Sequence, residues 1–315
     1  MNLKTTCFER ALFFSWYCAV GDCTYCYMST QPKFNKEKLA RRTTESLLAE
    51  VILCKNLGWE LGFVSGGQKA YKKVEFLELL SKIKQVYGKK VWINVGALSK
   101  AELIQNQPYI KGVVASIETI NYELHKKVCP SKPIKPFEDM LVEAQRLGLE
   151  KGMTLIVGLG ETIDDFELLK NFIKKYSITK IHIYGLNPQK GTMFENSEPP
   201  SAEYQAEWIR KTRQAFPDID IQCGIWVDRA GYVGKLLGAG ANSVSKFPAI
   251  KYFGSKQARE AERQARLAGR EFKGTLTELP VVNWDKEVDE LDLNDGLKEK
   301  IEQKLRAYLK KMKSH

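Results

Sequence analysis

Three cysteines fall within nine residues near the start of the chain, at Cys18, Cys23 and Cys26. Thiolates at this density can hold three irons of a four-iron cluster and leave the fourth iron without a protein ligand. An iron with an open position can bind and activate a small molecule. A zinc knuckle or a chance crowding of buried cysteines are the alternatives, but no nearby fourth Cys or His completes a closed tetrahedral zinc site.

The elements around this triplet alternate regularly between strand and helix. The apolar, aromatic-rich run 11–17 precedes the cysteines and has the length of a strand. Further along, helical spacing alternates with short apolar runs. We predict strands over 60–64, 91–95, 112–118, 153–157, 180–184, 219–223 and 241–244, and helices over 45–57, 74–86, 100–105, 136–147, 163–175, 202–215 and 232–237.

About eight strands alternating with helices are the order expected of a parallel (β/α) barrel, complete as in the TIM type or partial. An open doubly wound sheet is the rival α/β fold. The strand count favours the barrel. Polar residues or a thiol close successive strands, and in a barrel they converge on the face whose loops carry chemistry; they are Gln68, Asn94, Glu118, Asn187 and Cys223.

The composition changes at residue 254. We therefore predict a barrel over 1–253 and a basic, mostly helical C-terminal extension over 254–315, with a charged helical run at 255–270 and a basic helix at 297–313. This extension is either a solvated clasp over the barrel or a docking surface for an acidic protein.

The chain carries 49 Lys and Arg against 38 Asp and Glu, a net charge of +11. This balance suggests an acidic partner, although the heavily charged surface of a thermophilic protein gives a similar one. No apolar run approaches the roughly 20 residues of a membrane-spanning helix, and the start lacks the apolar region of a signal peptide. We expect a cytoplasmic protein that binds neither a membrane nor nucleic acid.

Two glycine motifs accompany the triplet. Gly66-Gly67-Gln68 follows the second predicted strand, and the segment 158–162 (Gly-Leu-Gly-Glu-Thr) follows the fifth. Glycines at strand ends let a ligand approach the backbone closely. In this order, from about residue 13 to 244, the motifs resemble the radical S-adenosylmethionine (SAM) superfamily, and more closely its biotin-synthase-like branch. The segment 240–243 (Gly-Ala-Asn-Ser) is also similar to that branch.

This resemblance implies a cofactor and a reaction. In the family, three cysteines bind a [4Fe-4S] cluster whose free iron chelates SAM, and reduction yields a 5′-deoxyadenosyl radical that abstracts hydrogen from an unactivated carbon. The implied cluster ligands are Cys18, Cys23 and Cys26. No other residue is assigned a catalytic role. The implied SAM contacts are Tyr25, Gly66, Gly67, Gln68, Ser116, Glu118, Gly158, Gly160, Glu161 and Asn187.

The chain departs from the family pattern in three places. Four residues separate Cys18 from Cys23, where three are usual, and Gln68 stands where an acidic residue is commoner. The cysteines that hold the sacrificial [2Fe-2S] cluster of biotin synthase have no counterparts on the second and third strands. Biotin formation is therefore not expected.

Three cysteines outside the triplet invite a second assignment. If Cys7 folds back across the barrel mouth, then Cys7, Cys129 and Cys223 could hold an auxiliary iron-sulfur cluster that donates sulfur. The alternative is that all three are small buried hydrophobes. The odd, uneven set of seven cysteines argues against a disulfide framework. His125 lies in a polar helical segment and is expected at the surface.

Within the branch, a basic member with possible auxiliary cysteines resembles one subunit of the two-component lipoyl synthases, which insert sulfur into a protein-bound octanoyl chain. That resemblance implies an acidic lipoyl carrier protein or domain, a partner radical SAM subunit and an electron donor. The alternatives are a cofactor maturase or a mutase of the same branch, without sulfur insertion, and a non-catalytic iron-sulfur scaffold.

Overall fold

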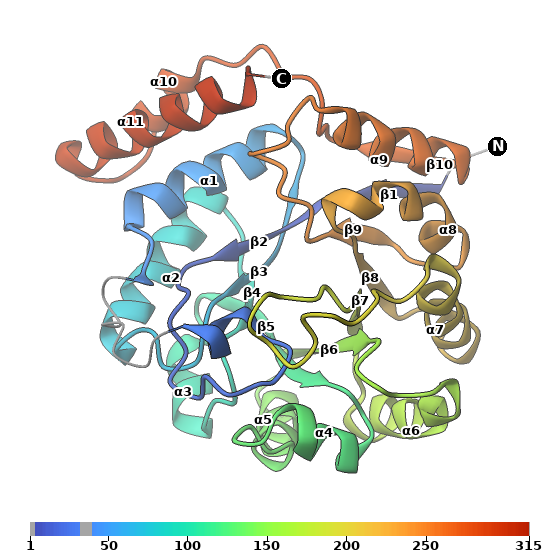
Figure 1. The fold of residues 1–315 in the computed structure, drawn as a ribbon. Helices are drawn as coiled ribbons and strands as arrows, with labels where there is room; N and C mark the ends of the chain where they lie inside the picture. The colour runs from blue at the N-terminus through green and yellow to red at the C-terminus, as the bar shows by residue number, and fades with distance from the viewer. Residues whose placement is uncertain (1–3, 32–39, 315) are drawn as a thin grey trace.

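Eight parallel strands form the centre of the protein, and the computed structural model describes residues 4–31 and 40–314 (Figure 1). Each strand pairs in parallel with the next one along the chain. In order, the strands are β2 (Glu9–Phe13), β3 (Glu60–Ser65), β4 (Val91–Asn94), β5 (Ile110–Glu118), β6 (Glu150–Val157), β7 (Lys180–Gly185), β8 (Asp220–Gly224) and β9 (Ser243–Ser245).

The sheet curls into a nearly closed barrel. No ladder joins the edge strands β2 and β9, but a parallel bridge between Phe8 and Val244 brings them together just before β2 begins. The predicted parallel α/β barrel is thus confirmed, and the doubly wound alternative is wrong. The first strand lies at residues 9–13 and not at 11–17, because the chain leaves the ladder after Phe13 to form the cysteine loop.

Helices cover the outside of the barrel (Figure 1). Their buried faces are apolar, as in α2, where Phe76, Leu79, Leu80 and Ile83 pack inward. Short 3-10 turns lie in the described connections, at η1 (Tyr27–Thr30), η3 (Ile163–Asp165) and η4 (Val227–Tyr232). The covering helices are α1 (Thr44–Asn56), α2 (Lys73–Tyr87), α3 (Lys100–Asn106), α4 (Tyr122–Val128), α5 (Lys135–Arg146), α6 (Phe166–Tyr176), α7 (Ala202–Ala215) and α8 (Val233–Gly238).

The residues after 253 pack onto this barrel. They form α9 (Lys256–Leu267), β10 (Arg270–Lys273), α10 (Trp284–Asp289) and α11 (Asp295–Met312). Strand β10 pairs with β1 (Lys4–Cys7), and α11 lies along α1 (Figure 1). The buried side chains of α11 belong to the same hydrophobic cluster as the barrel. The change in composition at residue 254 therefore does not separate two hydrophobic cores. No described helix is long and apolar enough to span a membrane.

A buried ion cluster joins the first strand to α1. The Glu50 carboxylate lies 2.5 Å from Arg10 Nε and 2.7 Å from Arg42 Nη2. Arg42 Nη1 also donates a hydrogen bond to the Phe13 carbonyl at 3.2 Å. Since Phe13 ends β2, this cluster fixes the point from which the cysteine loop departs.

Candidate functional site

A cavity of about 220 Å³ opens among the carboxyl ends of the strands. The three cysteines of the triplet line it. Six of the predicted SAM contacts line it as well, namely Tyr25, Gly66, Gly67, Gln68, Ser116 and Glu118. The structure therefore brings together at one end of the barrel residues that are up to 100 positions apart in the sequence.

The cysteine loop is held against the barrel at both ends. The Ala19 N–H donates to the Gln68 carbonyl at 3.0 Å, and the Thr24 N–H donates to the Val128 carbonyl at 2.9 Å. A Cβ atom added to Gly67 would lie 1.8 Å from the Tyr17 carbonyl oxygen, and one added to Gly66 would lie 2.4 Å from the Phe14 ring. The two glycines are thus required by the approach of the loop to β3, and not only by the approach of a ligand.

The thiols of the loop differ in their surroundings. A hydrogen bond from the Cys129 thiol lowers the pKa of Cys23, although burial opposes this shift. Burial raises the pKa of Cys26 to about 11. No three His, Cys, Asp or Glu side chains in the described parts of the chain are already grouped closely enough to hold one metal ion. Three soft sulfur donors around a single cavity nevertheless match the ligand set of a [4Fe-4S] cluster, so the residues fit that group.

Glu118 and Lys132 form a buried ion pair in the wall of the cavity. Lys132 Nζ lies 2.9 Å from Glu118 Oε1, and Thr154 Oγ1 donates to Glu118 Oε2 at 3.1 Å. Burial raises the pKa of Glu118, but the charge of Lys132 and these hydrogen bonds outweigh it and leave the pKa below its ordinary value. Glu118 is therefore an oriented carboxylate that stays ionised at neutral pH.

His125 supports this pair and is buried, so its predicted surface position is wrong. Its Nδ1 lies 2.9 Å from the Ile117 carbonyl oxygen and its Nε2 lies 2.7 Å from that of Lys132. The ring thus bridges the residue before Glu118 and the backbone of Lys132. The polar neighbours of His125 in the sequence predicted an exposed side chain. The ring is buried because the segment that follows α4 returns over it and brings the Lys132 carbonyl to its Nε2.

Sequence reasoning missed Lys132, Thr154, Tyr184 and Lys246, which also line the cavity. Tyr184 lies at the carboxyl end of β7 and Lys246 directly follows β9, so a position at or just after the end of a predicted strand was a usable signal. Lys132 follows α4 in a short turn, and no sequence pattern marks it.

Four of the predicted SAM contacts do not line this cavity: Gly158, Gly160, Glu161 and Asn187. The Glu161 carboxylate accepts hydrogen bonds from the N–H groups of Gly158 and Leu159 at 2.6 and 2.9 Å, so it stabilises its own turn. The side-chain oxygen of Asn187 accepts a hydrogen bond from Arg229. These residues lie at or beyond the carboxyl ends of β6 and β7, and their roles toward SAM stay predictions.

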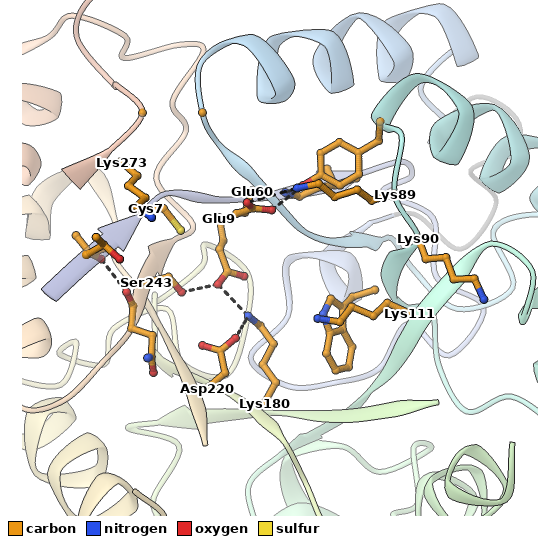
Figure 2. Close-up of a pocket in the computed structure, with 18 residues that line it drawn as sticks. Cys7, Glu9, Glu60, Lys89, Lys90, Lys111, Lys180, Asp220, Ser243 and Lys273 are labelled. Carbon is orange, nitrogen blue, oxygen red and sulfur yellow. Dashed lines mark hydrogen bonds and ion pairs between the residues drawn. The ribbon is translucent and has the colours of Figure 1, made fainter. Parts of the chain in front are cut away.

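The predicted auxiliary site of Cys7, Cys129 and Cys223 is not formed. Cys7 ends β1, before the first barrel strand begins, and therefore lies at the opposite, amino end of the barrel, beside Glu9, Lys180 and Asp220 (Figure 2). The Cys223 thiol is fully buried and donates to the Ser243 carbonyl at 3.3 Å. Of the three, only Cys129 lies near the triplet, where it contacts Cys23.

The amino end of the barrel is closed by an ionic network. Lys180 lies between Glu9, at 2.9 Å, and Asp220, and Ser243 donates to the same Glu9 carboxylate (Figure 2). The segment 240–243, which is similar to the biotin-synthase-like branch, belongs to this end. Its Asn242 accepts a hydrogen bond from the Ile221 N–H at 2.8 Å. This segment therefore serves the fold and not the cavity.

Comparison with solved structures agrees with this architecture. The fold is similar to that of methylornithine synthase, with a TM-score of 0.67 and 22% identity over 77% of this chain and 72% of that one. It is also similar to a maturase of the [FeFe]-hydrogenase, with a TM-score of 0.66 and 13% identity over 100% and 79% of the two chains. At these identities the likeness concerns the fold alone.

Sequence comparison finds relatives of several kinds. An uncharacterized protein of Methanocaldococcus jannaschii is 36% identical over 98% of this chain and 90% of its own length. The 7,8-didemethyl-8-hydroxy-5-deazariboflavin synthase of Archaeoglobus fulgidus is 27% identical over 56% of each chain. A biotin synthase of Thermodesulfovibrio yellowstonii is 25% identical over 71% of this chain and 72% of its own.

The family model described as the radical SAM superfamily matches residues 15–173 of the 315. The matched segment carries the cysteine triplet, the two glycines that hold its loop, and the Glu118–Lys132 pair. This chain therefore belongs to the radical SAM superfamily.

Proposed function

We propose that this protein cleaves SAM reductively and uses the adenosyl radical to abstract hydrogen from an aliphatic substrate bound in the cavity at the carboxyl end of the barrel. One observation carries the proposal: Cys18, Cys23 and Cys26 line the same cavity as the oriented Glu118 carboxylate. A [4Fe-4S] cluster held by these thiolates would supply the electron for the cleavage.

The chain's own residues prepare the cavity for a polar cofactor. Glu118 is held in one orientation by Lys132 and Thr154, so it can accept hydrogen bonds from the hydroxyl or amine groups of SAM without rearranging. Ser116 donates to Asn94 at 2.5 Å, which fixes a second polar group on the neighbouring strand.

Apolar side chains supply the rest of the wall. Ala11, Phe13, Phe63 and Ile156 line the cavity together with the polar groups. Such a lining excludes water and restrains the substrate, which protects a reactive intermediate from side reactions. The cavity therefore combines an oriented polar wall with an apolar one, as hydrogen abstraction from a carbon chain requires.

The test is SAM cleavage by anaerobically reconstituted, reduced protein. We expect 5′-deoxyadenosine and methionine to form, and alanine variants of Cys18, Cys23 or Cys26 to form neither. A Cys7→Ala variant is the matched control, since that thiol lies at the other end of the barrel. Full iron loading with no cleavage, across candidate substrates, would instead support an iron-sulfur scaffold.

One specific version of this function is sulfur insertion into an octanoyl group on an acidic carrier, as one subunit of a lipoyl synthase. It is supported by the net charge of +11 and by exposed lysines on α11, among them Lys300, Lys304, Lys310 and Lys311. Because Cys7, Cys129 and Cys223 do not converge, the sulfur would come from a partner radical SAM subunit.

This version predicts a product and a salt-sensitive encounter. Incubation with an octanoylated carrier domain, reductant and the partner subunit should add sulfur to the carrier, seen as a mass increase. Lys304→Glu with Lys311→Glu should slow carrier binding most at low salt, and a Lys304→Arg variant should not. Equal binding of the carrier to wild-type protein and to the variant with both lysines changed to glutamate would contradict this version.

A second candidate is a cofactor maturase or mutase that needs only the SAM cluster. The separation of Cys7 and Cys223 from the cavity favours it, since these reactions require no sulfur donor. In that case the wild-type protein should transform a small molecule without any gain of sulfur, and no carrier should be consumed.

A further inference from the structure

Lys246 occupies an unusual backbone position at the edge of the cavity. It follows β9 directly and has a φ of +67°, in the left-handed region. Lysine has no conformational reason to adopt this region, and such strain is retained where the surrounding structure imposes it, often at ligand-binding sites. Glu118, with a φ of +65°, shares both the conformation and the cavity.

Two neighbours fix the Lys246 side chain. Its Nζ lies 4.5 Å from the centre of the Tyr184 ring, and Tyr184 is itself held by a 2.9 Å hydrogen bond to Gln222. Gly224 makes room for this stack, because a Cβ atom there would lie 3.1 Å from Lys246 Cγ and 2.4 Å from the Tyr184 ring. The ammonium group is therefore built into the wall.

The Lys246 ammonium has no directly paired carboxylate among the described residues that line the cavity. Its carboxylate, Glu118, is already paired with Lys132 at 2.9 Å. Among residues 4–31 and 40–314, no carboxylate lies within ion-pair distance of Lys246 Nζ. Burial lowers the pKa of Lys246, and the more distant charges of Glu118 and Cys26 only partly oppose this shift. An ammonium withdrawn from water without a directly paired anion costs free energy that a bound carboxylate would restore.

We propose that Lys246 anchors a carboxylate group of the substrate. The inference rests on the proposed function and deepens it: the substrate is a small aliphatic carboxylic acid whose anionic end is held beside Tyr184 while its carbon chain lies along the apolar wall. An octanoyl group in amide linkage to a carrier has no such charge. This inference therefore favours the maturase or mutase over the lipoyl synthase subunit.

SAM also carries a carboxylate that Lys246 could bind. The experiment distinguishes the carboxylate of a substrate from that of SAM. Cluster-reconstituted wild-type protein, Lys246→Met and Lys246→Arg are titrated anaerobically with pentanoate, with the equally long but uncharged pentanamide, and with SAM. Lys304→Met, which removes an exposed lysine of α11, is the matched control. Iron content and uncoupled SAM cleavage are measured on every variant.

We expect wild-type protein to bind pentanoate about tenfold or more tightly than pentanamide, as a charge-assisted hydrogen bond predicts. This advantage should disappear in Lys246→Met and persist in Lys246→Arg and Lys304→Met. Iron content and SAM affinity should be unchanged in all of them.

Three results would overturn the assignment. Equal affinity for the acid and the amide in wild-type protein, including no binding of either, would show that the cavity takes no carboxylate from a substrate. Loss of SAM affinity alone in Lys246→Met would assign the lysine to the SAM carboxylate. Loss of iron would assign it to the thiolates. Absence of SAM cleavage in wild type and variants alike would remove the proposed function, while the carboxylate comparison would still be decided by binding.

Discussion

The Thr24 N–H donates a 2.9 Å hydrogen bond to the Val128 carbonyl, and the Thr24 hydroxyl approaches the same oxygen at 3.3 Å. This contact joins the later end of the cysteine loop to the end of α4, more than 100 residues away. Cys23 directly precedes Thr24 and Cys129 directly follows Val128, which is why their thiols meet. The cluster loop and the turn that carries Lys132 are therefore positioned together.

Gly67→Ala should impair cluster assembly. The added methyl would lie 1.8 Å from the Tyr17 carbonyl oxygen, and backbone cannot yield as a side chain can. Overpacking of this kind costs roughly 1–3 kcal/mol or more and would displace the cysteine loop. Iron content and cluster absorbance after reconstitution measure the effect. Gly231→Ala, where nothing lies within 4 Å of the added Cβ, should assemble normally; equal loading of both variants would contradict this account of the loop.

Lys132→Met should destabilise the fold, because it leaves the Glu118 carboxylate buried without its counter-charge. Removing one partner of a buried ion pair costs roughly 3–5 kcal/mol. The double variant Glu118→Gln with Lys132→Met should recover a large part of that loss. Urea unfolding of the cluster-free wild type, single variant and double variant measures the three free energies of unfolding. A Lys132→Met protein as stable as wild type would show that the pair contributes nothing to the fold.

Glu50 should make the fold sensitive to acid. Burial raises its pKa, but Arg10 and Arg42 outweigh this effect and leave the pKa below its ordinary value. A carboxyl group with a lowered pKa stabilises the folded state at pH above its unfolded pKa, and this contribution is lost as the pH falls through the folded value.

Glu50→Gln should therefore unfold more easily than wild type at pH 7, and the gap should narrow below about pH 4. The readout is the urea midpoint of both proteins across this range. A gap that stays constant with pH would show that the ionisation of Glu50 is not the source of the difference.

Iron counting should give about four irons per chain, the content of a single [4Fe-4S] cluster. Alanine at Cys7 or Cys223 should leave the count unchanged, because these thiols lie at the amino end of the barrel and in its core. Cys129→Ala should also keep four irons while altering the surroundings of the Cys23 ligand. About eight irons, with a loss in any of these variants, would restore the auxiliary cluster.

The sequence by itself determined the barrel and the location of its chemistry. Strand and helix periodicities are local, so runs such as 60–64 and 153–157 identify β3 and β6 without knowledge of their partners. The cysteine triplet and the polar ends of the strands are local as well. The rule that parallel strands present their carboxyl ends to one mouth then places Gln68, Ser116 and Glu118 beside the thiols.

The tertiary structure alone decided which charges and thiols meet. Cys7 lies at the far end of the barrel because β1 pairs with β10, some 266 positions later. His125 is buried because the chain return brings the carbonyl oxygens of Ile117 and Lys132 within hydrogen-bond distance of its two ring nitrogens. Lys246 faces the cavity because Gly224 and Tyr184, on two other strands, leave space for its stem. Such contacts depend on register and chain return between distant segments, and no local pattern of residues encodes them.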